Sequence, residues 1–196
     1  TPTKTGVAIL REQTLHVPVR AISCGVDTGR FHPRPGLDRA VIRQKYGLAP
    51  DRIALLYVGR VDREKGLDVI VNALASLRRD DVQMVIAGKG SYLQALKQLC
   101  CKLALGDRVV FTGFVPDEDL PLLYNSVAAF VMPSYAELQS IATLEAMSSG
   151  LPVLAANARA LPELVNPGKN GYLFTPGDVA DAARGIMALA NSRQRW

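Results

Sequence analysis

Short, uninterrupted apolar runs recur along the chain, and each is followed by a glycine or proline turn and then by a segment with helical spacing. A strand buried on both faces of a sheet has no polar face, so its sequence is a continuous apolar run. Parallel strands also need long crossover connections, which helices usually supply. The alternation therefore predicts an α/β fold built on a doubly wound parallel sheet.

The expected strands cover residues 21–24, 53–58, 82–87, 109–112, 127–132, 152–156 and 172–174. The expected helices cover residues 39–46, 66–79, 91–103, 117–125, 140–149, 160–165 and 179–191. Residues 1–15 have a weaker helical pattern that stands apart from this alternation. The elements predict one Rossmann-like domain, whose ligands would bind at the carboxyl ends of the strands.

The composition is that of a folded globular chain. A length of 196 residues is enough for one large domain with a full core. With 48% apolar and 21% charged residues, the chain is not expected to be disordered. Its longest apolar runs are far shorter than the roughly 20 residues that span a bilayer, so no transmembrane helix is expected. Three cysteines are too few for a disulfide scaffold and favour a reducing cytoplasm.

The net charge of +5 favours an anionic partner, which can be a nucleotide, a nucleic acid or the anionic face of a membrane. Aromatic residues make up only 6% of the chain, and no basic run is interleaved with Phe or Tyr. Stacking platforms for single strands are therefore not expected, and we predict no nucleic-acid partner. We expect a cytoplasmic location, with peripheral contact to the inner face of the membrane as the alternative.

Two cations follow the expected strand 53–58. Gly59 and Arg60 come first, and Lys65 follows just before Gly66 opens a helix. At the carboxyl end of a strand, an arginine can bind a diphosphate through two hydrogen bonds and a lysine can bind it as a point charge. The alternative is a solvated turn in which Arg63 or Lys65 pairs with acidic neighbours.

The segment Gly88, Lys89, Gly90 lies at the end of the expected strand 82–87 and opens a helix. It lacks the third glycine of a dinucleotide fingerprint and the ending of a P-loop. Its glycines would let a base or a ribose approach the backbone closely. Taken alone, the segment favours the simpler interpretation, a tight turn.

Asp117 and Asp119 form an Asp-x-Asp pattern that invites a metal-site interpretation. Pro116 precedes them and a leucine-rich segment follows, which is typical of a helix start. Carboxylates there complement the positive end of the helix dipole. We therefore expect no metal ligation by this pair.

The segment from 133 to 153 places two carboxylates at one strand end. Glu137 lies in the expected loop and Glu145 lies inside the following helix. Between them, the amides of residues 139–142 form a helix amino terminus, which suits an anion such as diphosphate. Because a carboxylate accepts paired hydrogen bonds from vicinal hydroxyls, one acid can bind a sugar and the other a ribose. The alternatives are surface acids, with Glu145 paired locally.

With these motifs in order, nearly the whole chain resembles the carboxyl-terminal half of a GT-B glycosyltransferase, of the retaining group 1 (family 4) type that uses nucleotide-activated sugars. Glu137 and Glu145 match the E-x7-E motif of that family, and residues 146–153 look like its continuation. Gly59-Arg60 and Lys65-Gly66 match the G-R-x-x-x-x-K-G motif of the family, and residues 88–90 match its G-x-G turn. Residues 111–115 match its x-x-G-x-V strand end. Residues 22–27 and 31–33 look like its interdomain hinge.

The resemblance implies a role for each matching position. Arg60 and Lys65 would hold the diphosphate and stabilise the departing nucleotide, and Glu137 would bind hydroxyls of the donor sugar. Glu145 would bind the ribose. The other implied donor-binding residues are Gly59, Gly88, Lys89, Gly90, Gly113, Val115, Leu138, Gln139, Ser140 and Ile141.

The resemblance also implies what the reaction uses. The donor would be a nucleoside diphosphate sugar, with a UDP-sugar ahead of a GDP-sugar, and neither a metal nor a cofactor is expected. No protein nucleophile is expected either, because the leaving phosphate would help to deprotonate the acceptor on the same face of the sugar.

The chain departs from the family pattern after the first glutamate. The family often has glycines there, whereas this chain has Leu138, Gln139 and Ser140. Side chains at these positions would narrow the approach of the diphosphate and alter sugar preference. Ser140 can instead cap the helix through its hydroxyl.

By resemblance, residues 1–20 are the residual end of an amino-terminal domain and an interdomain hinge. Residues 21–196 would be the donor-binding domain, ending before a final crossover helix. Acceptor recognition, of a lipid or a polysaccharide, would belong to the amino-terminal domain. Since catalysis here rests on positioning two substrates, we expect the isolated domain to be inactive.

Two rival functions remain. An epimerase or phosphorylase of the same fold would need its own acid and base groups, and the two histidines, His16 and His32, lie outside the expected site. A non-catalytic nucleotide-sugar sensor would keep the fold without transfer. The presence of both Glu137 and Glu145 argues against that sensor.

Overall fold

The computed structural model describes residues 1–13 and 17–191, so His16 lies outside the described residues. Its centre is a six-stranded sheet in the order β3-β2-β1-β4-β5-β6, with every neighbouring pair parallel. The strands are β1 Ile53–Val58, β2 Val82–Ala87, β3 Val109–Gly113, β4 Ala129–Met132, β5 Val153–Ala156 and β6 Gly171–Phe174. This order reverses between β1 and β4, as in a doubly wound Rossmann-like sheet, and confirms the predicted fold class.

The described residues also form seven α-helices and three 3-10 turns. The helices are α1 Lys4–Glu12, α2 Arg39–Lys45, α3 Leu67–Ser76, α4 Leu93–Lys102, α5 Leu120–Tyr124, α6 Ile141–Ser148 and α7 Val179–Asn191. The turns are η1 Arg63–Lys65, η2 Gly106–Arg108 and η3 Leu161–Glu163. Over residues 160–165, where an α-helix was expected, the structure has only the 3-10 turn η3. Pro162 and Pro167 have no amide hydrogen to donate, so the segment between them is too short for an α-helix.

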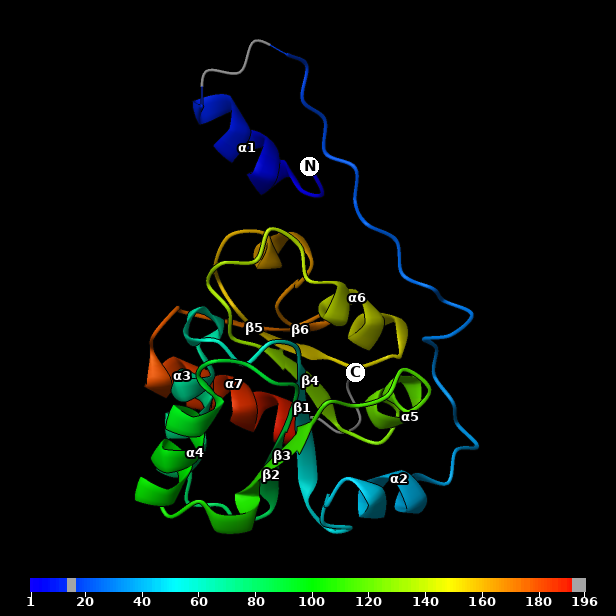
Figure 1. The fold of residues 1–196 in the computed structure, drawn as a ribbon, viewed down its shortest axis with the longest axis vertical. Helices are drawn as coiled ribbons and strands as arrows, with labels where there is room; N and C mark the ends of the chain where they lie inside the picture. Colours follow the sequence, from blue (N-terminus) through cyan, green and yellow to red (C-terminus); the bar gives the residue numbers. More distant parts are fainter. Residues whose placement is uncertain (14–16, 192–196) are drawn as a thin grey trace.

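Helices cover both faces of the sheet (Figure 1). α3, α4 and α7 lie on one face, where α7 packs against α3, and α5 and α6 lie on the other. The strands are buried as their apolar sequences require: Leu55, Leu56, Met84, Ile86 and Phe130 are almost fully buried. In the described part of the chain, no helix is long and apolar enough to cross a bilayer.

The expected strand over 21–24 is wrong. These residues are exposed and extended, and none of them joins a sheet in the described structure. The side chain of Ile22 is 75% exposed, while its amide donates to the carbonyl of Thr1 at 2.9 Å. The amide of Cys24 donates to the side chain of Gln139 at 2.8 Å. Among the described residues, no strand edge lies beside residues 21–24, so the amides of Ile22 and Cys24 donate to Thr1 and Gln139 instead of to a neighbouring strand.

Residues 17–38, named the strap below, connect α1 to α2 along the outside of the molecule (Figure 1). Phe31 anchors the strap: its side chain is only 3% exposed and meets the ring of Tyr124 edge-on, with centroids 5.8 Å apart. The side chain of Asn125 accepts from the Arg34 amide at 2.7 Å and donates to the His32 carbonyl at 3.0 Å. The strap is therefore attached to α5 and its end.

The first turn of α1 is docked on η3. The carboxylate of Glu163 accepts from the amides of Lys4 at 3.0 Å and Thr5 at 2.8 Å, and from the Thr5 hydroxyl at 2.7 Å. Desolvation alone would raise the pKa of Glu163, but these hydrogen bonds outweigh it and lower the pKa overall. The carboxylate thus stays ionised at the amino end of α1, where the helix dipole also favours a negative charge.

Candidate functional site

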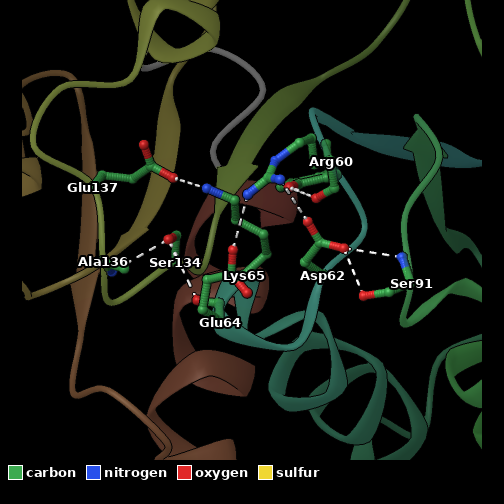
Figure 2. Close-up of polar contacts among 9 residues, drawn as sticks. Arg60, Asp62, Glu64, Lys65, Ser91, Ser134, Ala136 and Glu137 are labelled. Atoms are coloured by element: carbon green, nitrogen blue, oxygen red, sulfur yellow. Dashed lines mark hydrogen bonds and ion pairs between the residues drawn. The ribbon is translucent and has the colours of Figure 1, made fainter.

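The loops that follow β1 and β4 meet at the carboxyl edge of the sheet, where the strand order reverses. Gly66 has a left-handed φ of 63°, and a Cβ there would lie 2.7 Å from the carbonyl oxygen of Pro133. Only glycine combines this conformation with this approach. The buried hydroxyl of Ser134 joins the same two loops by donating to the carbonyl of Glu64 at 3.4 Å (Figure 2).

This contact brings Lys65 and Glu137 together. Lys65 Nζ lies 2.6 Å from Glu137 Oε1, and the two side chains are 17% and 14% exposed (Figure 2). They come from η1 and from the loop after β4, 72 residues apart in sequence. Little water reaches the pair, so their attraction is weakly screened and each charge depends on the other. The structure therefore joins two of the predicted site residues directly.

Arg60 reaches into the same region but is 73% exposed. Its guanidinium lies 3.2 Å from Asp62 Oδ2 and 3.2 Å from Glu64 Oε1 (Figure 2). The turn thus holds local ion pairs, as the alternative interpretation expected, although Arg60 makes them rather than Arg63 or Lys65. Exposed pairs contribute little, about 0–1 kcal/mol, so Arg60 can exchange these partners for a bound anion.

Asp62 is fixed by the segment after β2. Its Oδ1 accepts from the amide of Ser91 at 2.9 Å and from its hydroxyl at 2.8 Å (Figure 2). These hydrogen bonds lower the pKa of Asp62, and so does the nearby Arg60. The carboxylate is therefore ionised at neutral pH and holds the guanidinium over the carboxyl edge.

Gly88 and Gly90 lie against the loop after β1. The Val61 amide donates to the Lys89 carbonyl at 2.9 Å, which extends the pairing of the two strands into their loops. A Cβ at Gly88 would collide with the backbone of Gly59, and one at Gly90 with the backbone of Val61. The close approach expected of these glycines thus occurs between two loops. Lys89 itself is exposed.

Glu145 lies in α6 beside a buried tyrosine. The hydroxyl of Tyr124 donates to Glu145 Oε2 at 3.0 Å. Burial raises the pKa of Glu145 above its ordinary value, although the Tyr124 hydrogen bond and the Arg30 charge oppose this. The local pairing expected as an alternative is present, and one carboxylate oxygen remains for another donor. Sequence analysis missed Tyr124, because nothing in a leucine-rich helix marks its hydroxyl.

The residues after Glu137 differ in what their side chains do. Ser140 is buried, and its hydroxyl caps α6 by accepting from the Thr143 amide at 3.2 Å, which confirms the capping alternative. The capped amide belongs to Thr143, one residue beyond the expected anion site over 139–142. The side chains of Leu138 and Ile141 are about half exposed. The side chain of Gln139 is engaged by the strap, which sequence analysis did not expect.

The remaining predicted positions lie around β3. Gly113 ends the strand, and Val115 is buried in the core, so only the backbone of Val115 can face a ligand. Asp119 is bonded to Lys45 Nζ at 2.6 Å and to the hydroxyl of Tyr46. Those bonds connect α5 to α2. In residues 1–13 and 17–191, no three His, Cys, Asp or Glu side chains gather as metal ligands would.

A hollow of about 1110 Å³ lies at the opposite edge of the sheet. It is bordered by the amino ends of β1 and β5, through residues such as Ile53, Ala54 and Pro152, and by several arginines. None of the predicted site residues lines it. The predicted site residues therefore lie apart from this hollow.

Comparison with known proteins points to one family. The family model described as "Glycosyl transferases group 1" matches residues 38–195. A sulfoquinovosyl transferase of Arabidopsis thaliana is 36% identical over 173 residues, which cover 87% of this chain and 32% of the relative. A GDP-mannose-dependent alpha-(1-6)-phosphatidylinositol monomannoside mannosyltransferase of Mycobacterium tuberculosis is 36% identical over 180 residues, which cover 87% of this chain and 46% of the relative. The chain thus spans less than half the length of these relatives.

Solved structures share the same fold. Sucrose-phosphate synthase from Thermosynechococcus elongatus superposes with a TM-score of 0.86 at 30% identity, over 98% of this chain and 49% of the synthase. Anabaena HepE in complex with UDP-glucose superposes with a TM-score of 0.82 at 30% identity, over 90% of this chain and 49% of HepE. The similarity covers about half of each solved chain.

Proposed function

The chain belongs to the group 1 glycosyl transferases, and from this premise we propose that it is the donor-binding domain of an enzyme that transfers a sugar from a nucleoside diphosphate sugar to an acceptor. The observation that carries the proposal is the ion pair of Lys65 and Glu137 at the carboxyl edge between β1 and β4. Doubly wound sheets bind nucleotides at this reversal of strand order. A cation and a carboxylate side by side suit a diphosphate joined to a sugar.

Each side chain then has a role set by its position. Lys65 and Arg60 bind the diphosphate, and a charged hydrogen bond of this kind contributes about 1.5–3 kcal/mol. Glu137 is next to Lys65 and accepts hydrogen bonds from hydroxyls of the sugar. Glu145 accepts from the ribose, and the backbone at Gly59, Gly113 and residues 88–90 borders the base and the ribose.

We propose a retaining reaction without a divalent metal. The bond between the anomeric carbon and the diphosphate oxygen breaks, and negative charge grows on that oxygen. Lys65 and Arg60 stabilise this charge more strongly in the transition state than in the bound donor, which is what accelerates the step. The leaving oxygen accepts the proton of the acceptor hydroxyl on the same face, while the acceptor oxygen bonds to the anomeric carbon.

The donor that we propose is a UDP-sugar. Solved relatives hold UDP and UDP-glucose, whereas curated relatives named for GDP-mannose make GDP the alternative. The acceptor is a lipid or a polysaccharide, recognised by an amino-terminal domain that residues 1–20 would join to this one. A net charge of +5 suits a cytoplasmic enzyme that works beside an anionic membrane. Without the acceptor half, the domain binds donor and does not transfer sugar.

The test is a calorimetric titration of this chain with UDP, GDP and ADP, first in EDTA and then with magnesium. Saturable binding of one nucleotide in EDTA is expected. Binding that requires magnesium would overturn the metal-independent chemistry. If circular dichroism shows a folded chain and none of the three nucleotides binds, the donor-domain proposal is wrong.

A further inference from the structure

The loop that carries Glu137 has no secondary structure of its own. Each of residues 137–140 nevertheless makes a hydrogen bond to a different part of the chain. The Glu137 carbonyl accepts from the Ala160 amide at 3.2 Å, and the Leu138 carbonyl accepts from the Thr3 hydroxyl at 2.8 Å. The Gln139 side chain bonds to the strap, and the Ser140 hydroxyl bonds inside α6. Two of these four attachments thus come from residues before α2.

Gln139 uses both ends of its amide at once. Its Oε1 accepts from the Cys24 amide at 2.8 Å, and its Nε2 donates to the Ser23 hydroxyl at 2.6 Å. Two bonds from a planar amide fix its orientation as well as its distance from the strap. Neither bond could be made by glycine or by an apolar side chain of the same size.

This part of the strap is held by hydrogen bonds rather than by burial. Residues 20–25 are all exposed, and Ile22 leaves most of its side chain in water. Apolar burial, at about 25 cal/mol per Å², therefore contributes little here. Loss of the Gln139 bonds would remove the direct contact between this part of the strap and the loop. The indirect link would remain, in which Thr1 bonds to Ile22 and Thr3 bonds to Leu138.

We propose that Gln139 is a positioning residue, which latches the loop after β4 to the strap and thereby fixes Glu137 where it meets the donor sugar. The inference rests on the proposed function, because it concerns how the sugar is held. Gln139 is two residues from Glu137, and the loop between them has no ladder hydrogen bonds to fix its path. Lys65 belongs to η1 instead, so the latch acts directly on the sugar end of the donor and reaches the diphosphate end only through the ion pair of Lys65 with Glu137.

The test compares UDP with UDP-glucose, and GDP with GDP-mannose, in calorimetric titrations of the whole chain. Gln139→Met keeps the length of the side chain and removes both hydrogen bonds. Ser23→Ala removes one of them from the strap side. Gln94→Met, on the exposed face of α4, is the matched control. The sugar gain is the ratio of the affinity for the nucleotide sugar to the affinity for the nucleotide alone. With two hydrogen bonds lost, we expect Gln139→Met to reduce this sugar gain by about threefold to tenfold.

The same variant should leave the affinity for the nucleotide alone within about twofold, a split that general destabilisation would not produce. Ser23→Ala should give a smaller loss, and the double variant should lose no more than Gln139→Met, because both act on one contact. Gln94→Met should match the original chain. An unchanged sugar gain in Gln139→Met would overturn the positioning role.

Hydrogen exchange tests the latch without any ligand. In Gln139→Met, amides of residues 20–25 and 134–140 should exchange faster while the melting temperature stays the same. Unchanged exchange would overturn the latch itself. If Glu137→Gln loses the sugar gain and Gln139→Met keeps it, the proposed function stands and this inference fails. If the original chain binds no nucleotide, the proposed function and the positioning role both fail, and exchange alone decides the latch.

Discussion

The ammonium of Lys65 lies 2.6 Å from the carboxylate of Glu137, although the two residues follow different strands of the sheet. An ammonium has three donors, so Lys65 can hold a phosphate oxygen and keep Glu137 at the same time. The carboxylate in turn has lone pairs left for sugar hydroxyls. The pair would therefore hold its own geometry while it binds both halves of a donor, which limits the reorganisation that binding requires.

Replacing Lys65 with alanine tests the diphosphate site. We expect Lys65→Ala to weaken UDP binding by about 2 kcal/mol, near thirtyfold, since a charged hydrogen bond is lost and Glu137 is left unpaired. Calorimetric titration measures the change. Lys102→Ala, at the exposed end of α4, is the matched control and should bind like the original chain. Equal affinities for Lys65→Ala and the control would remove Lys65 from the phosphate site.

Gly66 should tolerate no side chain. Gly66→Ala combines a left-handed φ of 63° with a Cβ only 2.7 Å from the Pro133 carbonyl. Gly168→Ala has a φ of 77° and open space around its Cβ, so it isolates the conformational cost. We expect about 1–2 kcal/mol of destabilisation for Gly168→Ala. Gly66→Ala should cost at least about 1 kcal/mol more, because of the clash.

Urea unfolding of the two glycine variants measures this difference directly. If both lose the same free energy of unfolding, the close approach of the loops after β1 and β4 is not a constraint on the fold.

Nucleotide affinity should fall at low pH through Glu145. Burial beside Tyr124 raises the pKa of this carboxyl above its ordinary 4.5, against the opposing hydrogen bond from Tyr124 and the charge of Arg30, while Asp117 raises it further. Protonation therefore begins at a higher pH than for a free glutamate. The protonated acid accepts fewer hydrogen bonds from a ribose, so UDP binding weakens as pH falls through the raised pKa.

The same shift predicts a sign for stability. Because the folded chain binds this proton more tightly than the unfolded chain, the free energy of unfolding decreases as pH rises through the window above 4.5. The affinity prediction is tested by calorimetric titrations with UDP at several pH values, which compare the original chain with Glu145→Gln, a variant whose side chain cannot ionise. UDP itself titrates near pH 6, roughly, but that effect is common to both proteins. A ratio of affinities that is flat with pH would contradict the ribose role.

The strap should depend on one aromatic anchor. Phe31→Ala removes a side chain that is 3% exposed and packed edge-on against Tyr124, at an expected cost of about 3–5 kcal/mol. Phe114→Ala removes the same side chain where it is 68% exposed and should change stability by no more than about 0.5 kcal/mol. Denaturant unfolding compares the two. Similar losses would show that the strap is held mainly by its hydrogen bonds.

The sheet could be predicted from sequence because burial on both faces leaves a direct signature. β1 begins and ends where its apolar run does, at Ile53–Val58. β2 covers the expected Val82–Ala87, where the one polar residue, Gln83, is buried and hydrogen-bonded. The strand expected over 21–24 failed because four apolar or small residues do not show whether an edge is available to pair with. Pairing depends on neighbours that local sequence does not reveal.

The site could be predicted only in part, for a related reason. Strand ends mark Lys65 and Glu137, so their meeting follows from the order of the sheet. The bonds of Gln139 to Ser23 and Cys24 span more than a hundred residues and involve a backbone amide, which carries no sequence signal. Tyr124 is similar, because its hydroxyl matters only once α5 and α6 have packed.

The attachment of the loop after β4 also limits which sequence segments can be exchanged between relatives without breaking its contacts. The family match begins at residue 38, whereas Thr3, Ser23 and Cys24 hold this loop from before that point. A chimera that swaps residues 38–195 between two relatives would keep the sheet and separate the loop from its partners. A crossover placed ahead of α1 therefore keeps the loop together with Thr3, Ser23 and Cys24, whereas one placed at α2 does not.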